Sequence, residues 1–297
     1  MKALRDDQRP RSTEALVAEI ETRLALLGGR TALAARRIGS RPLSLGASRR
    51  NGKQKREEPP PADDTLLLRA DDLFPGASLL KICIAVEVLR RADLGQLILD
   101  ARLDTSTEPR VGGGGILDHL DASTRLTLRE LCLIMIALSD NTASNFLLDL
   151  VGIDEVNETL GRLALHNTRL ARRFMDFTAR AAGRDNLTTA CDMVALLALL
   201  HSNALPGAKE LREWLLAQRV ADDLRAWLPP EAELAFKTGE LPNTGAHDGV
   251  FHAAGLLTGP AGTSSVCVLT AGWDDLAAAH SAVGGVLRAL WHAWCTE

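Results

Sequence analysis

Residues 74–81 read Phe-Pro-Gly-Ala-Ser-Leu-Leu-Lys, and the following segment, 82–91, is apolar on nearly every side. A helix that is hydrophobic all round is a buried helix, so Lys81 is predicted at the start of a core helix. Burial favours the neutral form of a lysine, which can accept a proton. Ser78 lies about one turn earlier on the same face. The pair predicts a serine nucleophile with a lysine base; the alternative is a capping serine and a lysine that reaches solvent.

Strand patterns lie on both sides of a helical middle section. The sequence predicts terminal helices at 13–27 and 275–295 and five strands at 31–38, 66–69, 234–240, 249–258 and 264–272. The fold class is therefore predicted as α+β. One mostly antiparallel five-stranded sheet would carry both terminal helices on one face and an all-helical inserted domain on the other. The predicted domains are 1–74 with 206–297, and 75–205, with the active site in the cleft between them.

Two further segments have unusual composition. Segment 46–64 combines basic runs, acidic residues and three prolines. It predicts a solvated, mobile loop, and a basic interaction patch is the alternative. Segment 112–115 is four glycines, but no Gly-Lys-Ser/Thr follows and no strand pattern precedes it, so the phosphate-loop interpretation fails. A flexible loop close to a site is the prediction there.

Composition narrows the possible partners and the compartment. With a net charge of -4, no tyrosine and 4% aromatic residues, the 297-residue chain is not predicted to bind nucleic acid. No apolar run is long enough to span a membrane. No apolar signal segment follows Met1, so a cytoplasmic location is predicted if Met1 is the native start, and a secreted one is possible otherwise. Five cysteines without a Cys-x-x-Cys pattern predict free thiols. No metal site or cofactor is predicted.

Two more motifs follow the first in the chain. A capping box at 127–130 opens a buried helix that runs directly into Ser139-Asp140-Asn141. Small polar residues at the end of a core helix conflict with burial, and such conflicts are typical of functional sites. The alternative is a capped junction between two helices. Lys237-Thr238-Gly239 lies on a predicted strand.

Together the three motifs resemble the class A β-lactamase group of active-site serine hydrolases, with a transpeptidase-like fold. The similarity extends from about residue 13 to the C-terminus. It implies no cofactor and a small-molecule substrate that carries a carboxylate. It also implies a role for each motif residue, namely nucleophile (Ser78), base (Lys81), proton relay (Ser139), amide holder (Asn141), carboxylate binders (Lys237 and Thr238) and oxyanion hole (the N–H groups of Ser78 and Glu240), with Gly239 among the substrate-binding positions.

One departure concerns removal of the acyl group. The family carries a glutamate that activates the deacylating water, in the loop before a second capping box at 189–192. Between residues 169 and 186 this chain has only two acids, Asp176 and Asp185. Asp185 resembles the acid that fixes the loop through a salt bridge. Asp176 is the only candidate replacement base; the alternative is that it pairs with a loop arginine.

Three functions remain open on the sequence. The first is a β-lactamase-like hydrolase that acts through a Ser78 acyl-enzyme on a β-lactam or a related amide or ester. The second is an acyltransferase or penicillin-binding-type enzyme with an amine acceptor. The third is a β-lactam-binding protein that is acylated without turnover. The sequence does not predict the natural substrate or the oligomeric state.

Overall fold

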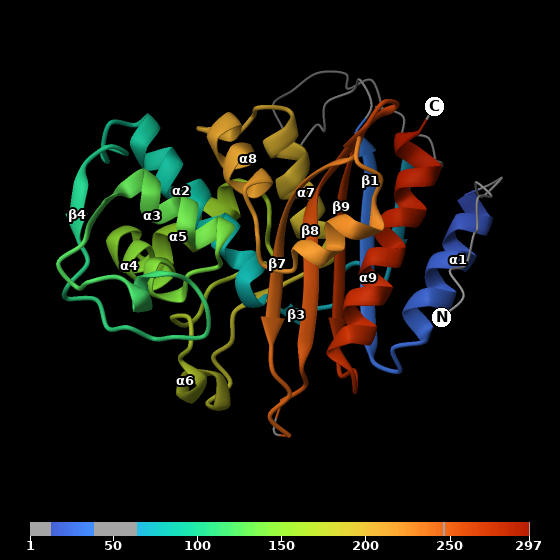
Figure 1. The fold of residues 1–297 in the computed structure, drawn as a ribbon, viewed down its shortest axis with the longest axis horizontal. Helices are drawn as coiled ribbons and strands as arrows, with labels where there is room; N and C mark the ends of the chain where they lie inside the picture. The colour runs from blue at the N-terminus through green and yellow to red at the C-terminus, as the bar shows by residue number, and fades with distance from the viewer. Residues whose placement is uncertain (1–12, 39–63, 246, 297) are drawn as a thin grey trace, which may run out of the picture.

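A five-stranded antiparallel sheet forms the centre of the molecule (Figure 1). The computed structural model describes residues 13–38, 64–245 and 247–296. The strand order is β2-β1-β9-β8-β7, and every neighbouring pair is antiparallel. The bounds are β1 (Arg30–Ile38), β2 (Thr65–Leu68), β7 (Glu233–Leu241), β8 (Val250–Gly259) and β9 (Gly262–Ala271). The five predicted strands are therefore confirmed, each to within two residues at either end.

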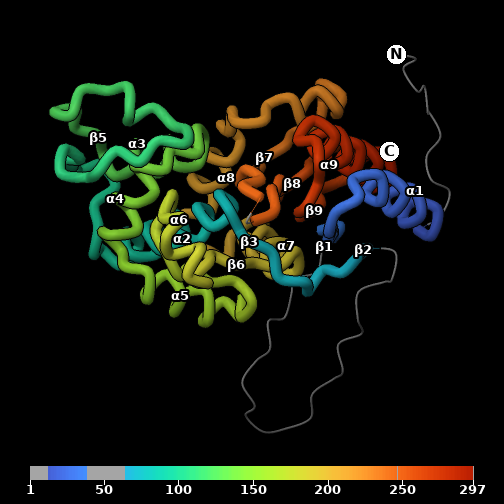
Figure 2. Tube along the Cα trace, turned by 90° about the horizontal axis from the view of Figure 1, so that it is seen from below, coloured from blue at the N-terminus to red at the C-terminus, as the bar shows by residue number. Residues whose placement is uncertain are grey.

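Helices cover both faces of the sheet. The terminal helices α1 (Thr13–Ala25) and α9 (Leu276–Leu290) pack together on one face, and α9 continues into a π-helical turn, η5 (Trp291–Cys295). Helix α7 (Ala190–His201) packs on the opposite face, where it contacts β1, β8 and β9. Figure 2 shows the terminal helices and α7 on opposite sides of the strands. This two-sided arrangement matches the predicted fold class.

The inserted segment is mostly helical. Its α-helices are α2 (Lys81–Asp93), α3 (Leu128–Ala137), α4 (Asn141–Val151), α5 (Ile153–Arg162) and α6 (Phe177–Ala181); α8 (Ala208–Leu216) and the 3-10 helix η4 (Asp222–Trp227) lead back to the sheet. The prediction of an all-helical insert was wrong in detail. Two ribbons interrupt it, β3 (Phe74–Pro75) with β6 (Leu187–Thr188) and β4 (Arg102–Asp104) with β5 (Arg125–Thr127). Strands of two or three residues are too short to show an alternating pattern.

The two predicted capping boxes have different outcomes. At the start of α3, the Thr127 hydroxyl accepts from the Glu130 backbone N–H, and the Glu130 carboxylate accepts from the Thr127 backbone N–H, as predicted. Thr189 accepts a hydrogen bond from the Asp192 backbone at the start of α7. The Asp192 carboxylate does not return to Thr189, because it accepts from the Asn167 backbone and the Thr168 hydroxyl instead. The second box is therefore a single cap, and its acid, Asp192, binds the start of the preceding loop.

Several predictions concern absences or undescribed segments. Most of segment 46–64 lies outside the described residues. Within the described part of the chain, no helix is both long and apolar enough to cross a bilayer. Over the same residues, no three His, Cys, Asp or Glu side chains lie together as metal ligands would. All five cysteines are free thiols, and all but Cys191 are buried.

Candidate active site

Ser78 lies in a strained turn that enters the core. It occupies the 3-10 helix η2 (Ala77–Leu80), which runs directly into α2 at Lys81. Ala77, just before it, has a φ of 45°, a conformation that costs a non-glycine residue energy and that gathers at functional sites. A Cβ on Gly239 of β7 would lie 3.1 Å from the Ser78 backbone nitrogen. A side chain there would make a tight contact with the serine turn, so glycine favours the close approach of the strand.

Lys81 is completely buried and bound entirely by neutral groups. Its Nζ donates to the Ser139 carbonyl at 2.6 Å, to the Ser139 hydroxyl at 3.1 Å and to Asn141 Oδ1 at 2.7 Å. Burial lowers its pKa well below the ordinary value, and the neighbouring Lys237 lowers it further, while Asp140 acts in the opposite direction. The protonated amine can donate to all three oxygens, and the lowered pKa favours loss of one of these protons. The neutral amine then has a lone pair that can accept a proton.

Ser139 connects the two buried lysines. Its hydroxyl accepts from Lys81 Nζ at 3.1 Å and from Lys237 Nζ at 3.1 Å. Its φ of 54° marks a second strained non-glycine position in the site. The next residue, Asp140, caps α4 through the Ala143 backbone and binds the backbone N–H groups of residues 116 and 117. The predicted capped junction is thus present, and it holds the Ser139 hydroxyl between the lysines.

Asn141 joins Lys81 to the glycine segment. Its Oδ1 accepts from Lys81, and its Nδ2 donates to the Gly112 carbonyl at 2.9 Å. Gly113 and Gly114 line the central cavity. All four glycines from 112 to 115 have positive φ, and a Cβ on Gly115 would overlap Asp140. The prediction that the glycine segment lies near a site is therefore confirmed.

Lys237 projects from the cavity-side edge strand β7 into the same region. It is fully buried, and burial lowers its pKa to about 7. Besides Ser139, its Nζ donates to the Thr238 carbonyl at 2.9 Å. Among the described residues no carboxylate pairs with it. A negatively charged ligand would therefore supply the missing counter-ion and favour the charged lysine.

Gln218 is a site residue that sequence reasoning missed. Its side chain is completely buried, and its surroundings assign the amide orientation. The nitrogen faces the carbonyls of Ile136 and Ala137 at 2.8 and 2.7 Å, and the oxygen faces Lys237 Nζ at 3.1 Å and the Thr238 backbone nitrogen at 3.2 Å. Gln218 thus ties the end of α3 to the Lys-Thr-Gly strand. Nothing in its local sequence indicates this role, because its partners lie far away in the chain.

A cavity of about 400 Å³ opens beside these groups. Residues from the inserted segment and from strand β7 both contribute to it. Among the described residues its lining is Ala77, Ser78, Gly113, Gly114, Leu138, Ser139, Asn141, Arg172, Phe174, Met175, Phe177, Asn186, Val220, Thr238, Glu240, Leu241 and Pro242. Glu240 is the single carboxylate in this lining.

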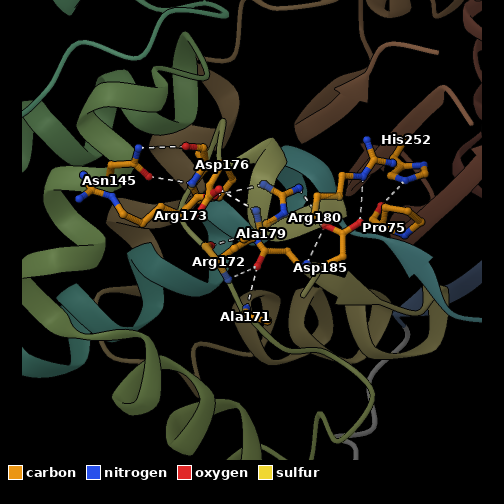
Figure 3. A network of polar contacts seen from close by, with 12 residues as sticks. Pro75, Asn145, Ala171, Arg172, Arg173, Asp176, Ala179, Arg180, Asp185 and His252 are labelled. Carbon is orange, nitrogen blue, oxygen red and sulfur yellow. Dashed lines mark hydrogen bonds and ion pairs between the residues drawn. The ribbon is translucent and has the colours of Figure 1, made fainter. Parts of the chain in front are cut away.

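The loop at 167–186 closes one side of the cavity, and Asp185 fixes it. The Asp185 carboxylate pairs with Arg172 at 2.8 Å and with Arg180 at 3.1 Å, as Figure 3 shows. Asn186 binds the backbone of residues 171 and 172 through its side chain, and its carbonyl accepts from the Gly76 backbone. The loop is therefore fastened directly to the turn that carries Ser78. The predicted salt-bridge role of Asp185 agrees with this geometry.

Asp176 lies in a different environment from the one predicted. Its side chain is exposed and caps α6 by accepting from the Ala179 backbone at 2.8 Å (Figure 3). It is absent from the cavity lining, so the geometry does not support a role as deacylation base. The alternative, a pair with Arg172, Arg173 or Arg180, is also wrong. Arg172 and Arg180 bind Asp185, and Arg173 binds Glu108 and Asp149. The short helix that it caps is what sequence reasoning missed.

Phe174 is the residue of this loop that lies beside the buried Lys81. Its ring centroid lies 4.9 Å from Lys81 Nζ, and the side chain lines the cavity. Asn145 clamps its backbone from both sides, accepting from the Phe174 N–H at 2.8 Å and donating to its carbonyl at 3.1 Å. The loop therefore presents a phenyl ring, rather than an acid, to the centre of the site.

His252 supports the strand that leads into the serine turn and was also missed. The Thr270 backbone donates to its Nδ1 at 3.1 Å, so the ring proton is on Nε2, which donates to the Pro75 carbonyl at 2.8 Å (Figure 3). Burial lowers its pKa to about 4, so the ring is neutral at physiological pH. A buried neutral histidine in a strand gives no sequence signal.

Comparison with known proteins agrees with this geometry. The model of the Beta-lactamase enzyme family matches residues 62–294, which is most of the chain. The chain belongs to this family. A β-lactamase from Sphaerobacter thermophilus has 27% identity and a TM-score of 0.75, with 93% of this chain and 95% of that chain covered. An ancestral class A β-lactamase has 26% identity and a TM-score of 0.76, with 93% and 98% covered.

PBP-A shares the fold at lower identity. It has 21% identity and a TM-score of 0.75, with 96% of this chain and 97% of that chain covered. A variant of PBP-A is known as an acyl-enzyme complex with penicillin G. The family match and the β-lactamase neighbours identify the chain as a serine hydrolase of the β-lactamase type with the class A fold.

Proposed function

We propose that the protein reacts with β-lactams, or with related amides and esters, through an acyl-enzyme at Ser78. The observation that carries this proposal is the continuous contact from Lys81 through the Ser139 hydroxyl to Lys237, beside the cavity that Ser78 lines. A buried amine next to a serine supplies a base, and a hydroxyl between two amines supplies a proton route.

Acylation then proceeds in a balanced sequence. Neutral Lys81 accepts the Ser78 hydroxyl proton while the serine oxygen bonds to the carbonyl carbon. The carbon–nitrogen bond breaks, and the Ser139 hydroxyl gives its proton to the leaving nitrogen. Ser139 regains a proton from Lys81, so the lysine returns to its neutral form. The two Ser139 contacts of 3.1 Å are within range for this transfer.

The remaining motif residues bind the substrate in this proposal. Lys237 and Thr238 bind its carboxylate by charge and by hydroxyl donation. Asn141 holds an amide of the substrate side chain and keeps Lys81 in place. The backbone N–H groups of Ser78 and Glu240 stabilise the oxyanion, and Gly239 lets the strand approach the serine. The substrate is thus a small carboxylate-bearing molecule.

A second candidate function follows from the side chains that lie near the acyl group on Ser78. Water needs a base to attack an ester, but Phe174 lies where the loop approaches Lys81, and Glu240 is the single carboxylate in the described lining. This favours slow hydrolysis. A penicillin-binding-type enzyme passes the acyl group to an amine, and a protein of the third kind stays acylated. Neither needs a base that activates water.

Mass spectrometry tests the proposal directly. The protein is mixed with benzylpenicillin, and its intact mass and its tryptic peptides are measured. A mass increase of one penicillin, located on the peptide that contains Ser78 and absent from Ser78→Ala, is the expected result. An adduct on another residue, or neither an adduct nor loss of the antibiotic, would contradict the β-lactam assignment.

A further inference from the structure

The Gln218 side chain joins two parts of the site that lie far apart in the chain. It is completely buried, in the segment between α8 and η4. Its amide nitrogen faces the carbonyls of Ile136 and Ala137, the last two residues of α3, at 2.8 and 2.7 Å. Its oxygen faces Lys237 Nζ at 3.1 Å. One amide therefore connects the helix that ends two residues before Ser139 with the strand that carries Lys237.

An amide is the side-chain group that suits both partners. The last carbonyls of a helix have no partner within the helix, and the Gln218 nitrogen donates to two of them. A charged glutamate would accept from the lysine but could not donate to the carbonyls, and an aliphatic side chain would do neither. The Gln218 oxygen also faces the Thr238 backbone nitrogen at 3.2 Å. The amide therefore fixes the position of the Lys-Thr-Gly strand relative to α3.

The partner that Gln218 offers to Lys237 is neutral. The other oxygens that accept from Lys237 Nζ are the Ser139 hydroxyl and the Thr238 carbonyl, which are neutral too. Burial lowers the pKa of Lys237 to about 7, and no negative charge among these contacts offsets the effect of burial. The contacts thus orient the amine without neutralising its charge.

Charged groups elsewhere in the site do not take the place of a counter-ion. Asp140, at the start of α4, is bound by three backbone N–H groups. Lys81 on α2 is a second amine, not an acid. Glu240, on β7 itself, is exposed at the cavity.

The elements packed against β7 supply no counter-ion either. The 3-10 helix η2 has no charged side chain, and the titratable residue of β8, His252, is neutral and bound to Pro75. The charged residues of α8 are exposed or paired with groups other than Lys237, namely Lys209, Glu210, Arg212 and Glu213. The part of the chain that the structure describes thus leaves the counter-ion of Lys237 to a ligand.

We propose that Gln218 is a positioning residue that holds Lys237 on a neutral partner and so leaves the carboxylate of the substrate to act as the counter-ion. This inference rests on the proposed function, because it takes the substrate carboxylate to bind at Lys237. The advantage of a substrate with a carboxylate over the same molecule without one then falls as Lys237 loses its proton. A carboxylate in place of the Gln218 amide neutralises the lysine from within and removes most of that advantage.

Benzylpenicillin and its methyl ester test this role, because the ester lacks the charged carboxylate. The second-order rate constant for acylation of Ser78 is measured for each by rapid quench and intact mass. The ratio of acid to ester does not depend on how much of a variant is folded. In the wild type this ratio is expected to fall several-fold between pH 6.5 and pH 8.5, because Lys237 becomes neutral.

Two glutamate variants separate the role of Gln218 from a general effect of charge. Gln218→Glu should lower the ratio at pH 6.5 about tenfold, the size of one hydrogen bond to a charged group. It should also remove the fall with pH, since the lysine stays charged. Gln96→Glu adds the same charge at an exposed residue outside the cavity lining and should behave as the wild type. Gln218→Met, which removes the oxygen, should shift the fall to lower pH and serves if Gln218→Glu does not fold.

The outcomes distinguish the role of Gln218 from the proposed function. A ratio in Gln218→Glu that equals the wild-type ratio, or an unchanged pH profile in Gln218→Met, would overturn the role of Gln218 while Ser78 acylation stands. If neither compound acylates the protein, the proposed function fails, and NMR of ¹³C-labelled lysine side chains decides the role of Gln218 alone. The Lys237 signal is assigned with Lys237→Met. A higher pKa of Lys237 in Gln218→Glu than in the wild type and in Gln96→Glu supports the inference, and equal values overturn it.

Discussion

The buried lysines predict an unusual dependence of stability on pH. The pKa of Lys237 is about 7 in the folded protein and 10.5 ordinarily. Between these values the unfolded chain holds a proton on Lys237 that the folded chain lacks. Raising the pH through this window therefore favours folding. Lys81, whose pKa is also lowered by burial and by Lys237, acts in the same direction.

The size of the Lys237 contribution follows from the same values. A full proton difference is worth about 1.4 kcal/mol per pH unit. At pH 7 about half of the folded molecules still carry the Lys237 proton, so its contribution from pH 7 to pH 8 is about 1 kcal/mol. The buried thiols act in the opposite direction, because burial raises the pKa of groups such as Cys83 to about 12. Their effect grows near pH 9, so the measurement ends at pH 8.

Urea denaturation at pH 7 and pH 8 measures this effect. The free energy of unfolding of the wild-type protein is expected to rise by at least about 1 kcal/mol. Lys237→Met, which keeps a long side chain without a charge, should reduce the rise by about 1 kcal/mol. A wild-type stability that is flat or falls over this range would refute the assignment of neutral buried lysines. So would a Lys237→Met variant with the same rise as the wild type.

Three further predictions concern the chemistry and the loop. Lys81→Met should lower the rate constant for acylation of Ser78 by roughly 10²–10⁴-fold, measured by rapid quench with benzylpenicillin; an unchanged rate would exclude Lys81 as the base. Phe174→Glu should shorten the lifetime of the acyl-enzyme by about 10²-fold or more, followed by intact mass after free penicillin is removed, whereas the Phe174→Leu control should leave it unchanged; equal lifetimes for both variants would contradict the reasoning. Asp176→Ala should lower the free energy of unfolding by about 1 kcal/mol through loss of the cap without changing that lifetime, and a changed lifetime would return Asp176 to the site.

Local patterns predicted the fold because each one is strong within a short window. The five strands and the terminal helices have long apolar or alternating runs bounded by turn residues. The Thr127 and Glu130 cap is contained in four residues. Ribbons of two or three residues escaped prediction, since their pairing depends on partners far away in the chain.

The sequence predicted only those site residues that belong to one of the three motifs. The structure brings Lys81, Ser139, Asn141 and Lys237 into contact, with Ser78 beside them in the cavity lining. Gln218, His252 and Asn145 act through backbone groups brought near by folding, so no spacing reveals them. Folding also decides which residue of the loop faces the site, so the sequence did not show that Phe174, and not Asp176, lies there. Sequence reasoning looked for an acid in the loop, but the fold turns the phenyl ring inward and leaves the acid on the surface as a helix cap.

Two features of the proposed function can be tested together: ready acylation of Ser78, and slow hydrolysis because the loop at 167–186 places no carboxylate in the described cavity lining. The most direct measurement mixes the protein with excess benzylpenicillin and follows ring opening and intact mass together from milliseconds to hours. A burst of one ring opening per Ser78, a matching adduct on the protein and slow further turnover are expected. Rapid linear turnover without a burst or an adduct would contradict it.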